Sequence, residues 1–92
     1  MKYLKVQWIH EEPEDPVILY SEIDDDGYET RKVEVFRDGR MTYADGDRST
    51  GDTWLGETPI PPLEEIQREV EFIPAPISSE DFEVIWHAAL TE

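Results

Sequence analysis

The sequence predicts an α+β fold: a four-stranded antiparallel β-meander, then a long loop, a short helix and a C-terminal helix packed on the sheet. Apolar residues alternate with polar ones through most of residues 1–44, which is the period of a half-buried strand. Two Asp-Gly pairs interrupt these runs and are typical of hairpin turns. The C-terminal residues instead place apolar side chains at helical spacing. From a length of 92 residues, we expect a single domain over residues 1–92.

Four strands are expected, over residues 2–10, 17–24, 28–37 and 40–44. In the first of them, Leu4, Val6 and Trp8 alternate with polar residues. The segment that follows, EEPEDP, is expected to be a loop because its two prolines would interrupt a ladder of hydrogen bonds. The remaining strands are separated by the Asp-Gly pairs, so we expect each strand to pair with the next one along the chain.

The two Asp-Gly pairs, at residues 26–27 and 38–39, are expected to close two-residue hairpins. A type I′ turn of this length needs positive φ at both central positions, which Asp-Gly supplies readily. The first turn sets Tyr20 opposite Val33, and the second sets Val33 opposite Ala44. Because side chains alternate along a strand, these registers decide which residues share a face of the sheet.

Both faces of the expected sheet are largely apolar. One carries Ile18, Tyr20, Val33, Val35 and Ala44, and the other carries Val17, Leu19, Ile23, Phe36, Met41 and Tyr43. The final helix can cover only one of them. Either the segment 45–76 wraps part of the other face, or that face leaves an exposed apolar patch rimmed by carboxylates, which would mark a protein-binding site.

The connection after the meander is expected to be irregular over residues 45–62, with Trp54-Leu55 as an anchor or a short edge strand. Loops of this length are uncommon and are often functional. A short helix is expected over residues 63–69. Residues 72–76 are expected to be extended, because two prolines there bias the residues before them away from helix.

The helix with the strongest sequence signals covers residues 79–90. Ser78 is its expected N-cap, and Ile77 is expected to pack against Phe82 across the start of the helix. Its apolar face is expected to carry Phe82, Ile85, Trp86, Ala89 and Leu90. The predicted core of the domain consists of Trp8, Val33, Val35, Phe82, Ile85 and Trp86.

The chain carries 23 acidic and 8 basic residues, a formal net charge of −15. Such a surface repels phosphate backbones and anionic lipid headgroups, so we expect no direct binding to nucleic acid or to membranes. The absence of cysteine excludes disulfides and thiolate metal sites and fits a reducing cytoplasm. We expect a cytoplasmic protein, since the sequence has neither a signal peptide nor an apolar run long enough to span a membrane.

Residues suited to catalysis or metal binding are few. The two histidines are His10 and His87, and the run His10-Glu11-Glu12 lacks the second histidine of the zinc-binding H-E-x-x-H pattern. The acidic turns lack the closing glutamate of a calcium loop. No catalytic residue, metal site or cofactor is therefore predicted. The best enzyme hypothesis is His10 with Glu11 as an acid–base pair at the end of the first strand.

Short stretches spread along almost the whole chain carry a family resemblance: residues 5–10, residues 31–40, Gly56-Glu57 before Pro59, Glu65-Ile66, and Phe82-Glu83 with Trp86. Through them the chain resembles a family of small, acidic bacterial domains of unknown function. The resemblance implies a standalone domain in a bacterial, cytoplasmic setting. It implies no activity.

The leading functional hypothesis is a non-enzymatic acidic binding protein for a basic protein partner, such as an inhibitor, an immunity protein or a mimic of nucleic-acid charge. Opposite charges can steer association to about 10⁸–10⁹ M⁻¹s⁻¹ at low salt. The alternative is a small regulatory or scaffold domain whose acidity serves solubility. The expected partner contacts are the acidic loops and one aromatic anchor: Glu11, Glu12, Glu14, Asp15, Asp24, Asp25, Asp26, Asp45, Asp47, Asp52 and Trp54.

Overall fold

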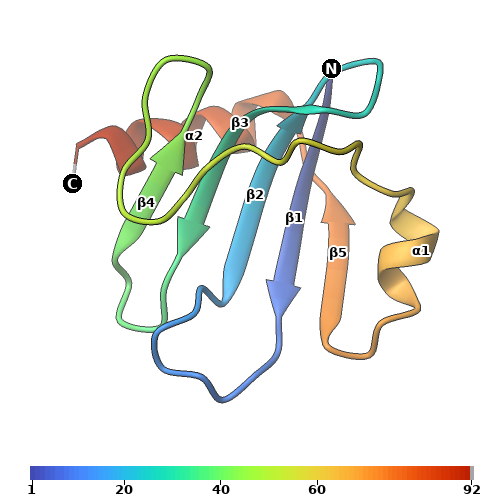
Figure 1. Ribbon diagram of the computed structural model, residues 1–92, viewed down its shortest axis with the longest axis horizontal. Helices are drawn as coiled ribbons and strands as arrows, with labels where there is room; N and C mark the ends of the chain where they lie inside the picture. Colours follow the sequence, from blue (N-terminus) through green and yellow to red (C-terminus); the bar gives the residue numbers. More distant parts are fainter. Residues whose placement is uncertain (92) are drawn as a thin grey trace.

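The computed structural model describes residues 1–91, which form an antiparallel sheet of five strands with two helices (Figure 1). The strands are β1 (Lys2–Trp8), β2 (Ile18–Ile23), β3 (Glu29–Val35), β4 (Met41–Ala44) and β5 (Phe72–Pro76), and the helices are α1 (Leu63–Gln67) and α2 (Ser79–Leu90). The order across the sheet is β4-β3-β2-β1-β5. The predicted α+β class is confirmed, whereas the predicted number of strands, four, is wrong.

The additional strand, β5, joins the sheet at the edge of β1. The sequence predicts only extended chain here, because a strand with two prolines cannot donate a full set of ladder hydrogen bonds. Pro74 pairs with Val6 and Pro76 with Leu4. Both prolines therefore lie in an edge strand, where one side has no neighbour to bond, and they make that side a poor template for a further strand.

The opposite edge of the sheet is closed by the chain itself. After β4 the backbone turns back so that Ser49 forms a bridge with Ala44. Thr50 N then donates to Tyr43 O at 2.9 Å, and the Thr50 hydroxyl accepts from Tyr43 N at 3.0 Å. The outer backbone groups of Tyr43 are thus already paired, so this edge also offers little to a strand from another chain.

The hairpin loops are three residues long rather than the predicted two. Phe36 N donates to Arg40 O at 2.8 Å and Gly39 N donates to Phe36 O at 2.9 Å. Among residues 1–91 only glycines have positive φ, including 91° at Gly39 and 90° at Gly27. A type I turn followed by one left-handed glycine needs a single positive φ, so the Asp before each glycine stays in an ordinary conformation.

The longer loop shifts the register of the β3–β4 pair by one residue. Val33 pairs with Tyr43 rather than with Ala44, so Met41 and Tyr43 share the face of Val33, and Ala44 lies on the other face. In the β2–β3 pair an irregularity at Glu22/Ile23 offsets the longer loop, and the predicted pairing of Tyr20 with Val33 is confirmed.

Helix α2 packs across the sheet on the face that is turned away in Figure 1. The predicted N-cap is confirmed, because Asp81 N donates to the Ser78 hydroxyl at 3.1 Å. Phe82, Trp86 and Ala89 are buried against the sheet with Tyr20 and Val33, and Ile77 packs on the same cluster. Three other members of the predicted core are only partly buried: Trp8, Val35 and Ile85.

A network of charged side chains ties β2 and β3 to α2. Arg31 donates to both carboxylate oxygens of Glu22, at 2.9 and 2.6 Å, and to both of Glu83, at 2.9 and 2.7 Å. The guanidinium also lies 5.0 Å from the ring centre of Phe82 and 5.1 Å from that of Trp86. Hydrogen bonding to Arg31 lowers the pKa of Glu22 from 4.5 to about 2.

The sheet face opposite α2, called the open face below, is only partly covered. Leu4, Val6 and Ile23 form a buried cluster on it. Residues 53–62, called the strap, cross in front of the sheet in Figure 1 and lead into α1. The strap adds Ile60 to the buried cluster, and α1 adds two further apolar side chains. The segment after β4 therefore wraps part of the second face, which is the first of the two alternatives left open by the sequence.

Polar bonds hold the strap to the sheet. The Thr53 hydroxyl donates to the Glu34 carboxylate, and Gly56 N donates to the Glu29 carboxylate at 2.8 Å. Ile60 N then donates to the β2–β3 turn at 2.7 Å. The first half of the strap is thus held on the sheet by hydrogen bonds to carboxylates on β3, and not by burial of the strap's own apolar side chains.

The prediction that Trp54-Leu55 anchors the loop or forms an edge strand is wrong. No strand passes through these residues, and 69% of Trp54 is exposed. Thr53 beside it is buried and carries the hydrogen bonds that fix this part of the strap. Because those bonds already attach the strap to the sheet, the indole has no anchoring role in the fold.

Candidate functional site

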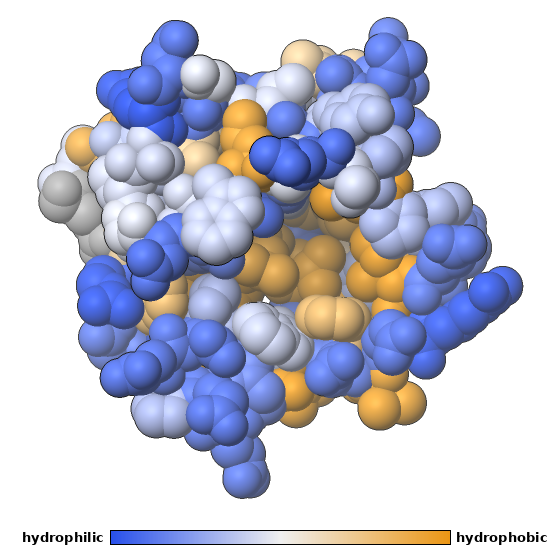
Figure 2. Space-filling view, in the orientation of Figure 1, coloured by the Kyte–Doolittle hydropathy of each residue, from blue (hydrophilic) through white to orange (hydrophobic). Residues whose placement is uncertain are grey.

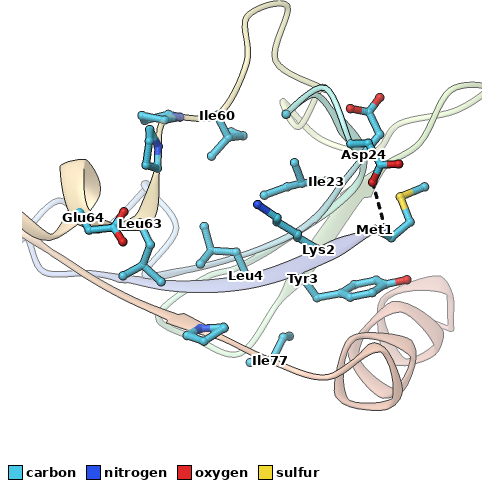
Figure 3. A pocket seen from close by; sticks show the side chains of 15 residues that line it. Met1, Lys2, Tyr3, Leu4, Ile23, Asp24, Ile60, Leu63, Glu64 and Ile77 are labelled. Carbon is cyan, nitrogen blue, oxygen red and sulfur yellow. Dashed lines mark ion pairs between the residues drawn. The ribbon is translucent and has the colours of Figure 1, made fainter.

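The open face is hollowed between the strap, α1 and the sheet. Figure 2 shows apolar residues inside this hollow and hydrophilic residues around it. One cavity of about 570 Å³ lies where β1, the β2–β3 turn, the strap and α1 meet, a volume within the range of about 300–1,000 Å³ that is usual for ligand pockets. We call it the apolar cavity because of the side chains that line it in Figure 3: Leu4, Ile23, Ile60, Leu63 and Ile77.

The turn between β2 and β3 sets one wall of the apolar cavity. Gly27 has a φ of 90°, and a Cβ placed on it would lie 3.3 Å from Pro59 Cβ. Glycine is required here both for the left-handed backbone and for this close approach of the strap. The Gly27 carbonyl accepts from Ile60 N, so the turn itself holds the wall that Ile60 contributes.

Charged groups surround the apolar lining. Asp24 and Asp25 come from the β2–β3 turn, and Glu64 comes from the first turn of α1 on the other side. Asp24 is occupied in part, since its Oδ1 accepts from the backbone N–H groups of Asp26 and Tyr28. Asp25 is almost fully exposed and lies 3.6 Å from the chain's terminal amino group. A cation that enters this rim therefore has carboxylates on two sides.

A second cavity of about 250 Å³ lies further along the open face and shares Leu4, Ile60 and Pro61 with the first. Its lining is also mainly apolar and includes Val6, Leu19, Ile66 and Phe72. Polar groups enter it at Glu29, whose carboxylate accepts from the Ser21 hydroxyl at 2.9 Å and lies 3.2 Å from Lys32 Nζ. Gly56 N donates to the other oxygen of this carboxylate, so both oxygens of the buried Glu29 side chain accept hydrogen bonds.

Three predicted contact residues meet in a third cavity, of about 520 Å³, near the other end of the sheet. Glu14 and Asp15 from the β1–β2 loop and Asp52 from before the strap line it, together with Trp8 and Phe36. The Trp8 indole N–H is buried and has no hydrogen-bond partner among residues 1–91. The structure thus brings together acids that lie far apart in the sequence.

The other predicted contact residues do not form one surface. The antiparallel topology puts the β1–β2 loop, with Glu11 and Glu12, at one end of the sheet and the β2–β3 turn, with Asp26, at the other (Figure 1). Asp45 and Asp47 lie beyond β4. Asp45 accepts from two backbone N–H groups and from Arg48, which lower the pKa of its carboxyl.

His10 has a role in shaping the loop that follows β1. Its Nδ1 accepts from Glu12 N at 3.0 Å, so Nε2 carries the hydrogen and donates to Pro16 O at 2.7 Å. The His10 carbonyl also accepts from Arg37 at 2.8 Å. Both ring nitrogens therefore form hydrogen bonds that hold the loop. Within residues 1–91 no three acidic or histidine side chains are grouped closely enough to hold a metal ion.

Sequence reasoning did not identify the residues that line the apolar cavity as a site. Ile60, Leu63 and Ile77 come from three separate segments after β4, and nothing local in the sequence indicates that they meet. The apolar second face of the predicted sheet did indicate an apolar surface. The wall of the cavity, however, depends on the backbone hydrogen bond between Ile60 N and Gly27 O. That contact is set by the three-residue turn.

None of the helices within residues 1–91 has the length and apolar character needed to cross a bilayer.

Comparison with known proteins identifies the family of the chain. No curated protein matches the chain, and no solved structure does. Residues 2–91 match the family described as "Domain of unknown function (DUF6881)", which confirms the resemblance to a family of unknown function. The chain therefore belongs to the DUF6881 family.

Proposed function

We propose that the chain is a non-enzymatic binding protein that takes up a basic protein partner on its open face. The observation that carries the proposal is the unequal cover of the two sheet faces. Helix α2 closes one face over the core, whereas the open face keeps apolar cavities bordered by carboxylates. An apolar cavity with a few polar groups at its rim is typical of a binding site.

The charge of the chain supports a basic partner. A net charge of −15 on 92 residues gives the whole surface a negative potential, which accelerates encounters with positive proteins and disfavours negative ones. An inhibitor, an immunity protein or a mimic of nucleic-acid charge would each act in this way. We propose a cytoplasmic setting, in keeping with a chain that contains no cysteine.

The test is affinity capture from a bacterial lysate on immobilised full-length chain, followed by elution with increasing salt. The proposal expects mainly basic proteins, bound at about 50 mM salt and released by about 500 mM, where the Debye length is only a few ångströms. Recovery of mainly neutral or acidic proteins, or binding that is equally tight at both salt concentrations, would contradict it. That result would favour the alternative, a regulatory or scaffold domain whose acidity serves solubility.

A further inference from the structure

We infer that the apolar cavity is the receptor for one apolar side chain of the partner, presented between arginine or lysine residues. This inference rests on the proposed function and specifies the chemistry of the segment that binds. The cavity offers about 570 Å³, whereas a water molecule takes about 30 Å³ in the liquid, so there is room for a whole side chain. The part of its lining formed by Leu4, Ile23 and Ile60 is hydrocarbon, against which an apolar side chain can be buried.

The charges around the cavity specify what flanks the apolar side chain. Asp24 and Asp25 stand on one side and Glu64 on the other, so a residue that precedes the anchor and one that follows it can each meet a carboxylate. Cations already present in the lining are Lys2 and the terminal amino group, and the amino group is paired with Asp25. Acids therefore outnumber the local cations, in line with the charge of the whole chain, and a cationic segment is complementary to the rim.

The edges of the sheet argue for insertion of a side chain over addition of a strand. A partner that adds a strand needs a row of free backbone donors and acceptors on an edge. Prolines occupy two positions of β5, and the return of the chain at Ser49 and Thr50 closes the edge of β4. Since neither edge suits strand addition, the affinity of a partner would depend on what enters the open face.

The test uses the labelled full-length chain and three short blocked peptides, acetyl-Arg-Leu-Arg-amide, acetyl-Arg-Ala-Arg-amide and acetyl-Glu-Leu-Glu-amide, titrated at low salt. Methyl NMR signals of Ile23, Ile60 and Leu63 report occupation of the apolar cavity, and those of Val84, exposed on α2, serve as the control. The Arg-Leu-Arg peptide is expected to shift the cavity signals and leave Val84 unchanged. Replacing its leucine by alanine is expected to weaken binding about tenfold.

Two double variants with the same net charge separate the rim from the general field of the protein. Asp25→Asn with Glu64→Gln removes two rim carboxylates, and Asp26→Asn with Glu65→Gln removes their sequence neighbours, which do not line the cavity. The first variant is expected to bind Arg-Leu-Arg about two- to tenfold more weakly than the native chain. The second variant is expected to lose less than half as much affinity for the peptide as the first, because it changes only the long-range electrostatic field of the protein.

The outcomes distinguish this inference from the function on which it rests. Equal binding of the alanine and leucine peptides, equal loss in both double variants, or no shift at Ile23, Ile60 and Leu63 would overturn the inference. In those cases the broader proposal would stand only if basic peptides still bind elsewhere with strong dependence on salt. Equal binding of the Glu-Leu-Glu peptide would instead overturn the proposed function, because the cavity would then accept an apolar side chain regardless of charge.

Discussion

The charged network around Arg31 makes a quantitative prediction about stability. We expect Glu22→Gln to lower the free energy of unfolding at pH 7, because the glutamine cannot form the charged pair with Arg31. One unit of pKa difference corresponds to about 1.36 kcal/mol, so a pKa of about 2 in the folded protein against 4.5 corresponds to about 3 kcal/mol. Only 9% of the Glu22 side chain is exposed, so solvent screening reduces this value little.

The sign of the pH dependence follows from the same pKa values. The folded protein holds Glu22 ionised at a lower pH than the unfolded chain does, so the stabilisation is complete above about pH 4.5 and is lost as the pH falls toward 2. The difference between native chain and variant should therefore shrink to about half by pH 3. Protonation of the other acids affects both proteins alike, which is why the difference, and not either curve alone, is informative.

Urea unfolding of the native chain and the variant at several values of pH between 7 and 3 measures this difference directly. Glu83→Gln is the control, since 41% of that side chain is exposed and its loss should cost only about 0–1 kcal/mol. A change of less than about 0.5 kcal/mol in the free energy of unfolding for Glu22→Gln at pH 7, or a difference that does not vary with pH, would show that the charged pair with Arg31 does not stabilise the fold.

Five further substitutions test other parts of the fold, each by urea unfolding at pH 7. Gly39→Ala should cost about 1–2 kcal/mol from the left-handed backbone alone, since nothing lies within 4 Å of the added Cβ; an unchanged midpoint would contradict that conformation. Ser78→Ala should cost about 1 kcal/mol, and Ser79→Ala much less, because only the first residue caps α2. Phe82→Ala should cost about 3–5 kcal/mol, as the ring is fully buried. Trp54→Ala should stay within about 0.5 kcal/mol of the native chain, and a larger loss would show that the exposed indole does anchor the strap.

The elements with local signals were the predictable ones. Helix α2 has a cap at Ser78 and apolar side chains at helical spacing, and its observed bounds, Ser79–Leu90, agree with the prediction. The strands β1 to β4 have period-2 alternation and are found within a few residues of the expected ends. In both cases the pattern of burial is visible within one short window of sequence.

The features that depend on distant residues could not be derived in the same way. Pairing of β5 with β1 joins segments about seventy residues apart in the sequence. The two prolines of β5 also argued against a strand, because proline cannot donate a ladder hydrogen bond. The register of β4 depended on whether Asp38 takes positive φ, and both loop lengths are compatible with an Asp-Gly pair. The prediction assumed a two-residue loop where the structure has three residues. It therefore placed Met41, Tyr43 and Ala44 on the wrong faces of the sheet.

The candidate site illustrates the same limit. The sequence indicated an acidic surface and an apolar second face, both of which bear on the site. It did not indicate that Ile60 and Leu63 would build a cavity above Leu4, or that the predicted acids would divide between two ends of the sheet. Which charged side chains lie together in space depends on the order of the strands in the sheet. Amino-acid composition carries no information on that order.

Binding of a basic partner on the open face can be tested by a hydrogen-exchange footprint of the complex. The full-length chain would be compared alone and with the basic protein recovered at low salt. Slower exchange is expected in the strap, in the β2–β3 turn around Gly27 and in α1, with no change on the outer side of α2 around Val84. Protection confined to α2, with the strap and the turn exchanging as in the free chain, would contradict it.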